Sequence, residues 1–359
     1  MAPSPTAQRP IGVAIAGLGF GEAVHLPALQ NVPELEPVAL WHRRQDRLDE
    51  ACSNSGLKGY HCWDSLLEDS RVDAVIIATP PAPRFELAMR ALKAGKHLLL
   101  EKPVALNAQD VADLQREAIG RGLSVAVDFE YRAVPLFQQA ARLLEQGAVG
   151  NPWLVKLDWL MSSRANPQRA WNWYSQASQG GGVIGALGTH AFDTLAWLIG
   201  SVGEPQAMTR TAIEQRPDCE GNMRPVDADD IALINVDLGT HQGGTVAAQV
   251  ALSSVARNGR GCWIEIYGSE GSLVLGSENQ KDYVHGFSLT LQQGGDAPRN
   301  VQPDEDLRFA TTWSDGRVAP VARLQSWWAQ SIQKGHPMVP GLAEGLASQQ
   351  ACDRTLTSR

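Results

Sequence analysis

The chain has 359 residues and a formal net charge of −8, which makes it too long for one compact core and predicts two domains. The acidic balance, with a pI near 5.5, disfavours nucleic acid and anionic membranes as partners. The five cysteines are odd in number and lack CxxC spacing, so we expect reduced packing residues, no disulfide framework and no metal site.

The N-terminal stretch MAPSPTAQRP has neither the basic start nor the apolar region of a signal peptide. No later window approaches the roughly 20 apolar residues that a membrane-spanning helix needs. We therefore expect a cytoplasmic chain that carries no targeting signal and no membrane anchor.

Short apolar runs alternate with helix-length amphipathic segments from Ile11 to about Arg132. The runs are IGVAIAG, PVALW, VDAVIIAT, HLLLE and LSVAVDF. This alternation is typical of βαβ units and predicts a parallel sheet that is covered by helices on both faces. Residues 1–133 are thus expected to form an α/β domain.

A glycine-rich turn, GLGFGE, follows the first strand and opens a helix. Gly17, Gly19 and Gly21 allow a tight turn in which the backbone around Phe20 can approach a pyrophosphate at the helix N-terminus. Glu22 stands where a third glycine would permit close helix packing. The context predicts a Rossmann dinucleotide site, and the alternative is a tight turn without a ligand.

Three basic residues, His42, Arg43 and Arg44, follow the second strand. An NAD site carries an acidic residue here for the ribose 2′-hydroxyl, whereas arginines can bind a 2′-phosphate. NADP is therefore the expected cofactor, with NAD possible. The alternative is that these residues are solvated charges at the start of a helix.

The motif EKP, with Glu101 and Lys102, comes directly after the fourth strand. Open α/β sheets bind ligands at this carboxyl edge, where a desolvated lysine can act as a proton donor or acceptor. Taken alone, a lysine at a strand end is more often a surface cation.

After a helical segment near residues 134–146, the βαβ pattern gives way to alternating strands separated by turn residues. The strands predicted beyond it are WLVKLDWLM, IALINVDLG, TVAAQVAL, WIEIYG and FSLTLQ, with a hairpin at GSEG and a long surface loop at 214–230. Residues 134–340 are expected to form an α+β domain with a large, mostly antiparallel open sheet. Two terminal helices follow, and the one within 341–359 is expected to pack back on the first domain.

Taken together, GLGFG, ATPP, AGKHLLLEKPVA and the glycine run before GTHAFD resemble the Gfo/Idh/MocA oxidoreductase family over nearly the whole chain. The resemblance implies an NAD(P)-binding domain, to which Thr79, Pro80 and Glu101 also contribute. It implies a second domain that holds a sugar, polyol or related substrate and often mediates oligomerisation. It assigns the catalytic positions to Lys102 and His190.

Three positions depart from the family pattern. The usual aspartate four residues before the histidine is Ala186, the usual asparagine after the fifth strand is Glu130, and the common histidine after the TP turn is Arg84. The family also includes branches with other chemistry, so the substrate is not inherited from the resemblance.

His190 is expected in the first turn of a helix that begins near Gly188. The helix N-terminus disfavours a protonated imidazole, which favours a neutral His190 that positions substrate while Lys102 relays the proton. Asp193 either lies beside His190 or bonds the neighbouring domain. A structural histidine at a domain junction is the alternative.

Aromatic residues precede the glycine run in WNWY. Trp171 and Tyr174 could line a sugar ring, or could serve only interdomain packing. The complete set of expected substrate-binding residues is Lys102, Glu130, Trp171, Tyr174, Thr189 and His190.

These features predict an NADP(H)-dependent oxidoreductase that interconverts a hydroxyl and a carbonyl on a sugar-like or cyclic polyol substrate. One alternative is a non-catalytic NADP-sensing regulator on the same fold. The other is an enzyme that uses nicotinamide transiently, such as a glycosidase. We expect a small-molecule partner and a homo-oligomer formed through the sheet of the second domain.

Overall fold

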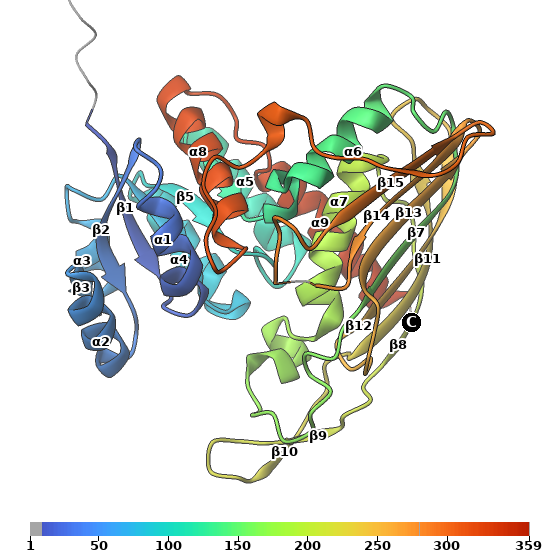
Figure 1. Cartoon of the computed structure of the whole chain (residues 1–359). Coiled ribbons are helices and arrows are strands. Elements are labelled where there is room, and N and C mark those ends of the chain that lie inside the picture. Colours follow the sequence, from blue (N-terminus) through green and yellow to red (C-terminus); the bar gives the residue numbers. More distant parts are fainter. Residues whose placement is uncertain (1–8, 280, 359) are drawn as a thin grey trace, which may run out of the picture.

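The computed structural model describes residues 9–279 and 281–358. The expectation for the first eight residues therefore lies outside the described part. Two sheets stand at opposite ends of the molecule, with helices between them (Figure 1).

The first sheet is parallel and has the order β3-β2-β1-β4-β5-β6 within the described residues. Its strands are β1 (Ile11–Ala16), β2 (Leu35–Trp41), β3 (Lys58–Tyr60), β4 (Ala74–Ile77), β5 (His97–Leu100) and β6 (Val125–Val127). β1, β4 and β6 are buried along their whole length, as expected for apolar runs covered on both faces. The Rossmann architecture predicted from the sequence is confirmed, with β3 as an additional short edge strand.

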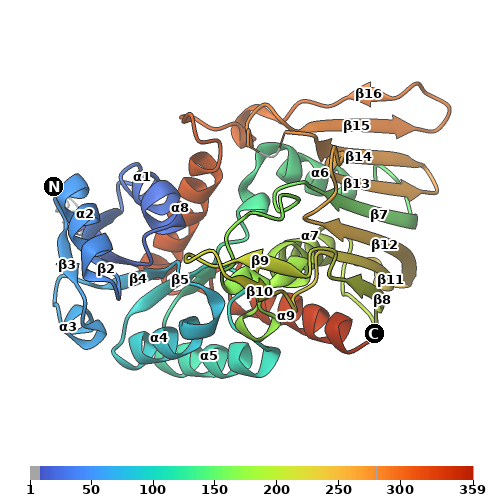
Figure 2. The same cartoon turned by 90° about the horizontal axis from the view of Figure 1, so that it is seen from below.

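Helices cover both faces of this sheet (Figure 2). One face packs against α1 (Leu26–Leu29), α2 (Gln45–Ser55) and α8 (Val318–Lys334). The other packs against α3 (Trp63–Leu67), α4 (Pro81–Lys93) and α5 (Ala108–Arg121). Trp328 of α8 shares a core with Ile15, so this helix lies on the first sheet although its residues fall within the range expected for the second domain.

The second sheet has the order β16-β15-β14-β13-β7-β12-β11-β8 in the described chain. Its strands are β7 (Pro152–Leu160), β8 (Gln206–Arg210), β11 (Ile231–Gly239), β12 (Thr245–Ser253), β13 (Gly261–Gly268), β14 (Gly271–Ser277), β15 (Ser288–Gln293) and β16 (Arg299–Asn300). The pairing is antiparallel except between β7 and β12, which are parallel. This arrangement confirms the predicted α+β domain, and the GSEG hairpin joins β13 to β14.

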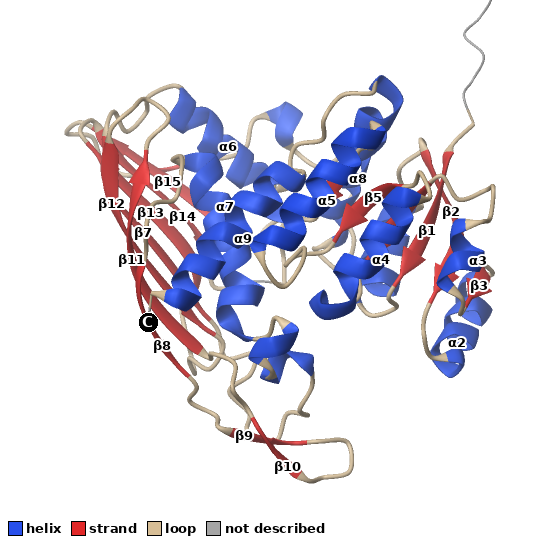
Figure 3. Ribbon diagram, turned by 180° about the vertical axis from the view of Figure 1, so that it is seen from behind, coloured by secondary structure: helices blue, strands red, loops and turns tan. Residues whose placement is uncertain are grey.

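One face of the second sheet packs on α6 (Pro135–Glu145) and α7 (Thr189–Leu198), while the other face is open (Figure 3). The last helix, α9 (Leu342–Thr357), lies between the domains and contacts α5 and α7. Its Leu342 belongs to the core of the first domain, whereas Cys352 belongs to that of the second. Short helical turns complete the chain: η1 (Gly21–His25), η2 (Glu130–Ala133), η3 (Trp173–Ser175), η4 (Ala177–Gln179), η5 (Ile184–Gly188) and η6 (Glu305–Leu307).

Two local expectations were wrong. Residues 214–230 are not simply a loop, because β9 (Gln215–Pro217) and β10 (Met223–Pro225) form a hairpin that projects from the domain (Figure 3). Cys62 and Cys219 are exposed and so are not packing residues.

Among the described residues, no helix is both long and apolar enough to cross a membrane.

Candidate active site

The glycine turn lies at the switch point of the first sheet, where the chain leaves β1 for β2 on one side and later returns to β4 on the other. Gly17 has φ +96°, and a Cβ there would come within 2.6 Å of the carbonyl oxygen of Ala78. A Cβ on Gly19 would meet nothing within 4 Å, so this backbone is open to a ligand. The turn therefore fits the pyrophosphate of a dinucleotide at the N-terminus of a helix.

Gly21, and not position 22, allows the close packing of the helix against β1. A Cβ on Gly21 would lie 2.8 Å from Cγ2 of Ile15, so the helix can approach β1 only with glycine there. Residues 21–25 form a π-helical turn, which begins at Gly21 itself. The Oε2 atom of Glu22 instead lies 3.8 Å from the Nη2 atom of Arg47.

The basic residues after β2 differ in their surroundings. Arg44 is bound to Asp46, with 3.1 Å between Nε and Oδ1, and the Nδ1 atom of His42 contacts the backbone of Arg44. Arg43 is exposed and has no ion pair within the described part of the chain.

Arg84 stands where the family commonly has a histidine, and its side chain binds backbone carbonyl groups. It is fully buried, and its guanidinium donates hydrogen bonds to the carbonyl oxygens of Thr79, Glu101 and Pro103. Burial lowers the pKa of Arg84 to about 10. Arg84 thus joins the turn after β4 to the EKP segment after β5. Thr79 is buried beside the glycine turn, and Pro80 is exposed at the start of α4.

Lys102 reaches from the end of β5 into the second domain. Its Nζ atom donates a hydrogen bond of 3.3 Å to the carbonyl oxygen of Ala186, in the turn before α7. The side chain is half-buried and bonded across the domain boundary, so it is not the free surface cation that the alternative interpretation of EKP required. It stands where the carboxyl edge of the first sheet meets the glycine run.

Behind Lys102 lies a buried cluster that sequence spacing did not indicate. His25 Nε2 is 3.1 Å from Glu101 Oε1 and 3.6 Å from Asp128 Oδ2. Burial opposes the ionisation of Glu101, but the hydrogen bond with His25 and the charge of Lys102 outweigh it and hold its pKa at about 2. Burial and the neighbouring Glu101 raise the pKa of Asp128. The three side chains have ligand atoms that could hold a metal ion, although none was expected from the sequence.

Glu130 and His190 lie together at the domain boundary. Glu130 Oε2 is 3.6 Å from His190 Nε2, and both side chains are buried. Burial raises the pKa of Glu130 to about 7, against the opposing charge of Lys102. Burial and the charge of Lys102 lower the pKa of His190. The site thus combines a neutral imidazole, a carboxyl group that titrates near neutrality and a lysine.

His190 is the second residue of α7, whose N-cap is Gly188, as expected from the sequence. The helical backbone, however, already begins at residue 182 and passes through η5, so no free helix N-terminus faces the imidazole. Its ring is enclosed by Phe129, Tyr131 and Trp159, with centroid distances of 6.0, 5.1 and 6.0 Å. Desolvation in this enclosure, and not the helix N-terminus, disfavours the imidazolium.

Asp193 is held by Arg132 and not by His190. Arg132 Nε and Nη2 donate hydrogen bonds of 2.8 and 2.7 Å to the two carboxylate oxygens of Asp193. Both residues are buried, so this bidentate pair fastens η2 to α7.

The remaining predicted substrate residues are engaged within the protein. Trp171 Nε1 donates to the carbonyl oxygen of Pro225 at 2.9 Å, next to the projecting hairpin. Tyr174 is buried under Arg164, whose Cζ lies 3.4 Å from the ring centroid. Thr189 Oγ1 donates to the carbonyl oxygen of Gly185. Of the substrate residues predicted from the sequence, Lys102, Glu130 and His190 are the three brought together.

A family model described as an oxidoreductase family with an NAD-binding Rossmann fold matches residues 11–129, and its C-terminal alpha/beta domain model matches residues 141–359. The chain belongs to the Gfo/Idh/MocA family of NAD(P)-dependent oxidoreductases. An uncharacterized oxidoreductase from Synechocystis sp. is 44% identical over 96% of this chain and 92% of its own length.

Other members of the family with known names are more distant. Levoglucosan dehydrogenase from Pseudarthrobacter phenanthrenivorans is 30% identical over 63% of this chain and 61% of its own length. A structure of levoglucosan dehydrogenase with NADH and L-sorbose has a TM-score of 0.84, at 22% identity, and covers 97% of this chain and 96% of that one. A 3-ketoreductase from Actinomadura kijaniata, in complex with NADP and TDP-benzene, has a TM-score of 0.76, at 23% identity, and covers 98% of each chain. These structural matches establish the shared fold.

Proposed function

We propose that this oxidoreductase interconverts a hydroxyl and a carbonyl on a sugar-like or cyclic polyol substrate. The observation that carries the proposal is the approach of Lys102 to the helix of His190. Lys102 donates a hydrogen bond to the carbonyl oxygen of Ala186 across the domain boundary, and burial together with the charge of Lys102 lowers the pKa of His190. Names of relatives support the substrate class, because they include levoglucosan dehydrogenase and a reductase of a dTDP-linked keto sugar.

The cofactor is proposed to be NADP(H). The turn formed by Gly17, Gly19, Phe20 and Gly21 would hold the pyrophosphate, and Arg43 would bind the 2′-phosphate. When bound, the nicotinamide accepts or donates the hydride. One relative's structure contains NADH and another contains NADP, so the preference rests on the residues after β2 of this chain.

Lys102 is proposed to exchange a proton with the substrate oxygen and to place a positive charge near the developing alkoxide. His190 would accept a hydrogen bond from a substrate hydroxyl through Nδ1, a buried atom without a partner among the described residues. Its neutral form suits this role, since a neutral imidazole has one acceptor nitrogen. The aromatic and carboxyl groups around it exclude water from the reacting carbon.

A panel of sugars, polyols and their keto forms, followed by nicotinamide absorbance with NADP and NAD, tests this function. We expect turnover of at least one cyclic polyol or keto sugar, with NADP preferred. Absence of net absorbance change, together with turnover and persistent bound cofactor, would instead support transient redox chemistry. Cofactor binding without any turnover would support the sensing regulator.

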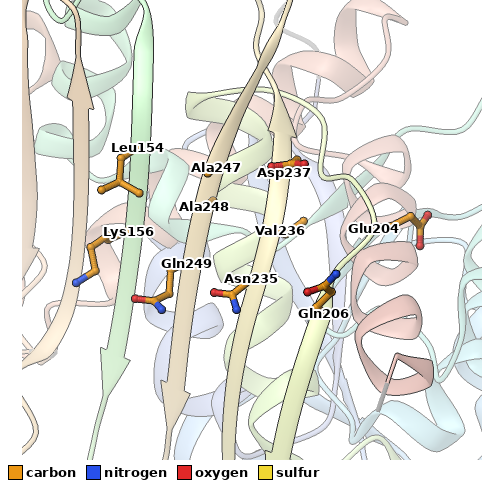
Figure 4. A pocket seen from close by; sticks show the side chains of 10 residues that line it. All are labelled: Leu154, Lys156, Glu204, Gln206, Asn235, Val236, Asp237, Ala247, Ala248 and Gln249. Carbon is orange, nitrogen blue, oxygen red and sulfur yellow. The ribbon is translucent and has the colours of Figure 1, made fainter.

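The open face of the second sheet is the proposed site of self-association. It exposes Leu154, Met208, Leu233 and Tyr267, with a polar row between them. The row crosses four paired strands and contains Gln206, Asn235, Gln249 and Lys156, which line a hollow of about 490 Å³ (Figure 4). Sedimentation of the parent chain and of Leu233→Asp tests this; a variant that sediments as the parent oligomer would contradict it.

A further inference from the structure

Among the described residues, no carboxylate of its own helix pairs with His190. The preceding turn contributes Ala186, and Asp193 on the following turn is fully occupied by Arg132. A carboxylate reaches the ring from a different element, because Glu130 belongs to η2, the turn that follows β6 in the first domain.

The contacts between η2 and α7 form two successive pairs. Arg132 binds Asp193 through two hydrogen bonds, and two residues earlier on η2, Glu130 faces His190, three residues earlier on α7. The buried Arg132–Asp193 pair fixes the relative position of the two elements. Phe129 and Tyr131, which flank Glu130, also enclose the His190 ring. The position of Glu130 against His190 is therefore set by an interface and not by chance side-chain orientation.

We propose that Glu130 replaces the missing helix carboxylate as the residue that orients His190. Its Oε2 atom stands 3.6 Å from Nε2, so the carboxylate favours the tautomer that carries its proton on Nε2 and leaves Nδ1 as the acceptor for a substrate hydroxyl. Glu130 is thus a positioning residue that acts through His190. This inference rests on the function proposed above.

Two substitutions separate the loss of the oxygen beside Nε2 from a change of charge. In Glu130→Ala that oxygen is lost and KM should rise roughly tenfold, the scale of one polar interaction. In Glu130→Gln an amide oxygen stays beside Nε2, so KM should rise much less than in Glu130→Ala. Glu145→Gln, on the exposed side of α6, is the matched control and should keep the parent KM.

Nitrogen NMR of histidine-labelled protein supplies a readout that needs no substrate. The His190 signals are assigned by their loss in His190→Asn. We expect one tautomer, Nε2–H, in the parent and in Glu130→Gln, and a mixture of tautomers in Glu130→Ala.

Unchanged His190 signals in Glu130→Ala, or equal rises of KM in Glu130→Ala and Glu130→Gln, would overturn the inference. If no compound of the panel is turned over, the proposed function fails. The NMR comparison still decides whether Glu130 orients His190, so the two failures are distinguishable.

Discussion

Lys102 Nζ lies 3.3 Å from the carbonyl oxygen of Ala186 and donates a hydrogen bond to it. Lys102 belongs to the Rossmann domain, and Ala186 to the helical turn that leads into α7. The bond thus places the amine of the EKP motif beside the imidazole-bearing helix. Ala186 contributes to the site through its backbone, although its side chain offers no proton-transferring group.

Lys102→Ala should lower turnover by roughly 10²–10⁴-fold, the scale of general acid–base catalysis, because proton exchange with the substrate oxygen is lost. Affinity for the cofactor should change only modestly. Steady-state kinetics and cofactor titration measure both effects, with the exposed Lys93→Ala on α4 as a control. Near-parent turnover would reduce Lys102 to a structural cation.

Arg43→Ala should weaken NADP binding by about 1.5–3 kcal/mol, the value of a hydrogen bond to a charged group, and should leave NAD binding nearly unchanged. Arg44→Ala should have the smaller effect, since Arg44 is already paired with Asp46. Calorimetric titration of both cofactors checks this. Equal dissociation constants for NADP and NAD in the parent would contradict the assignment.

His190→Asn should raise KM more than it lowers turnover, because the imidazole chiefly positions substrate while Lys102 exchanges the proton. Kinetics at saturating substrate make the comparison. Abolished turnover at saturation would instead identify His190 as an essential general base, and the division of roles between the two residues would be wrong.

Asp193→Asn should destabilise the fold by about 3 kcal/mol, since removing one charge leaves Arg132 buried without its counter-ion. The control is Asp306→Asn, whose partner Arg142 lies at the surface, where an ion pair contributes about 0–1 kcal/mol. Chemical denaturation of both variants measures the difference. Equal losses would show that the Arg132–Asp193 pair does not fasten η2 to α7.

Glu130→Gln should change how stability depends on pH. The folded-state pKa of Glu130 is raised from 4.5 to about 7, so between these values the folded parent binds more protons than the unfolded chain. Raising the pH through this window therefore destabilises the parent, and the variant lacks this contribution. Thermal denaturation from pH 4.5 to 8 should show the variant gaining stability relative to the parent. A constant difference would mean that Glu130 does not titrate there.

The sequence by itself determined the features that depend on neighbouring residues. Uninterrupted apolar runs predicted the buried strands β1, β2, β4, β5 and β6, and alternating ones predicted most of the second sheet, because burial on one or two faces imposes these periods. The glycine turn and the EKP motif were found for the same reason, since each follows directly from the end of a strand. The strands β3, β8, β9, β10 and β16 were missed because they are short and, unlike β6, do not coincide with an apolar run.

Only the tertiary structure decided how distant residues combine. Glu130 contacts His190 because η2 packs against α7. For the same reason Arg132 binds Asp193, which lies 61 residues further along the chain. The tertiary structure likewise showed that Gly21 does the packing expected of a third glycine and that Arg84 joins two turns of the backbone. Spacing along a chain defines which side chains share a strand or a helix face, whereas contacts between elements depend on how whole surfaces pack. For this reason the carboxylate beside His190 was sought on its own helix, while the folded chain supplies it from the other domain.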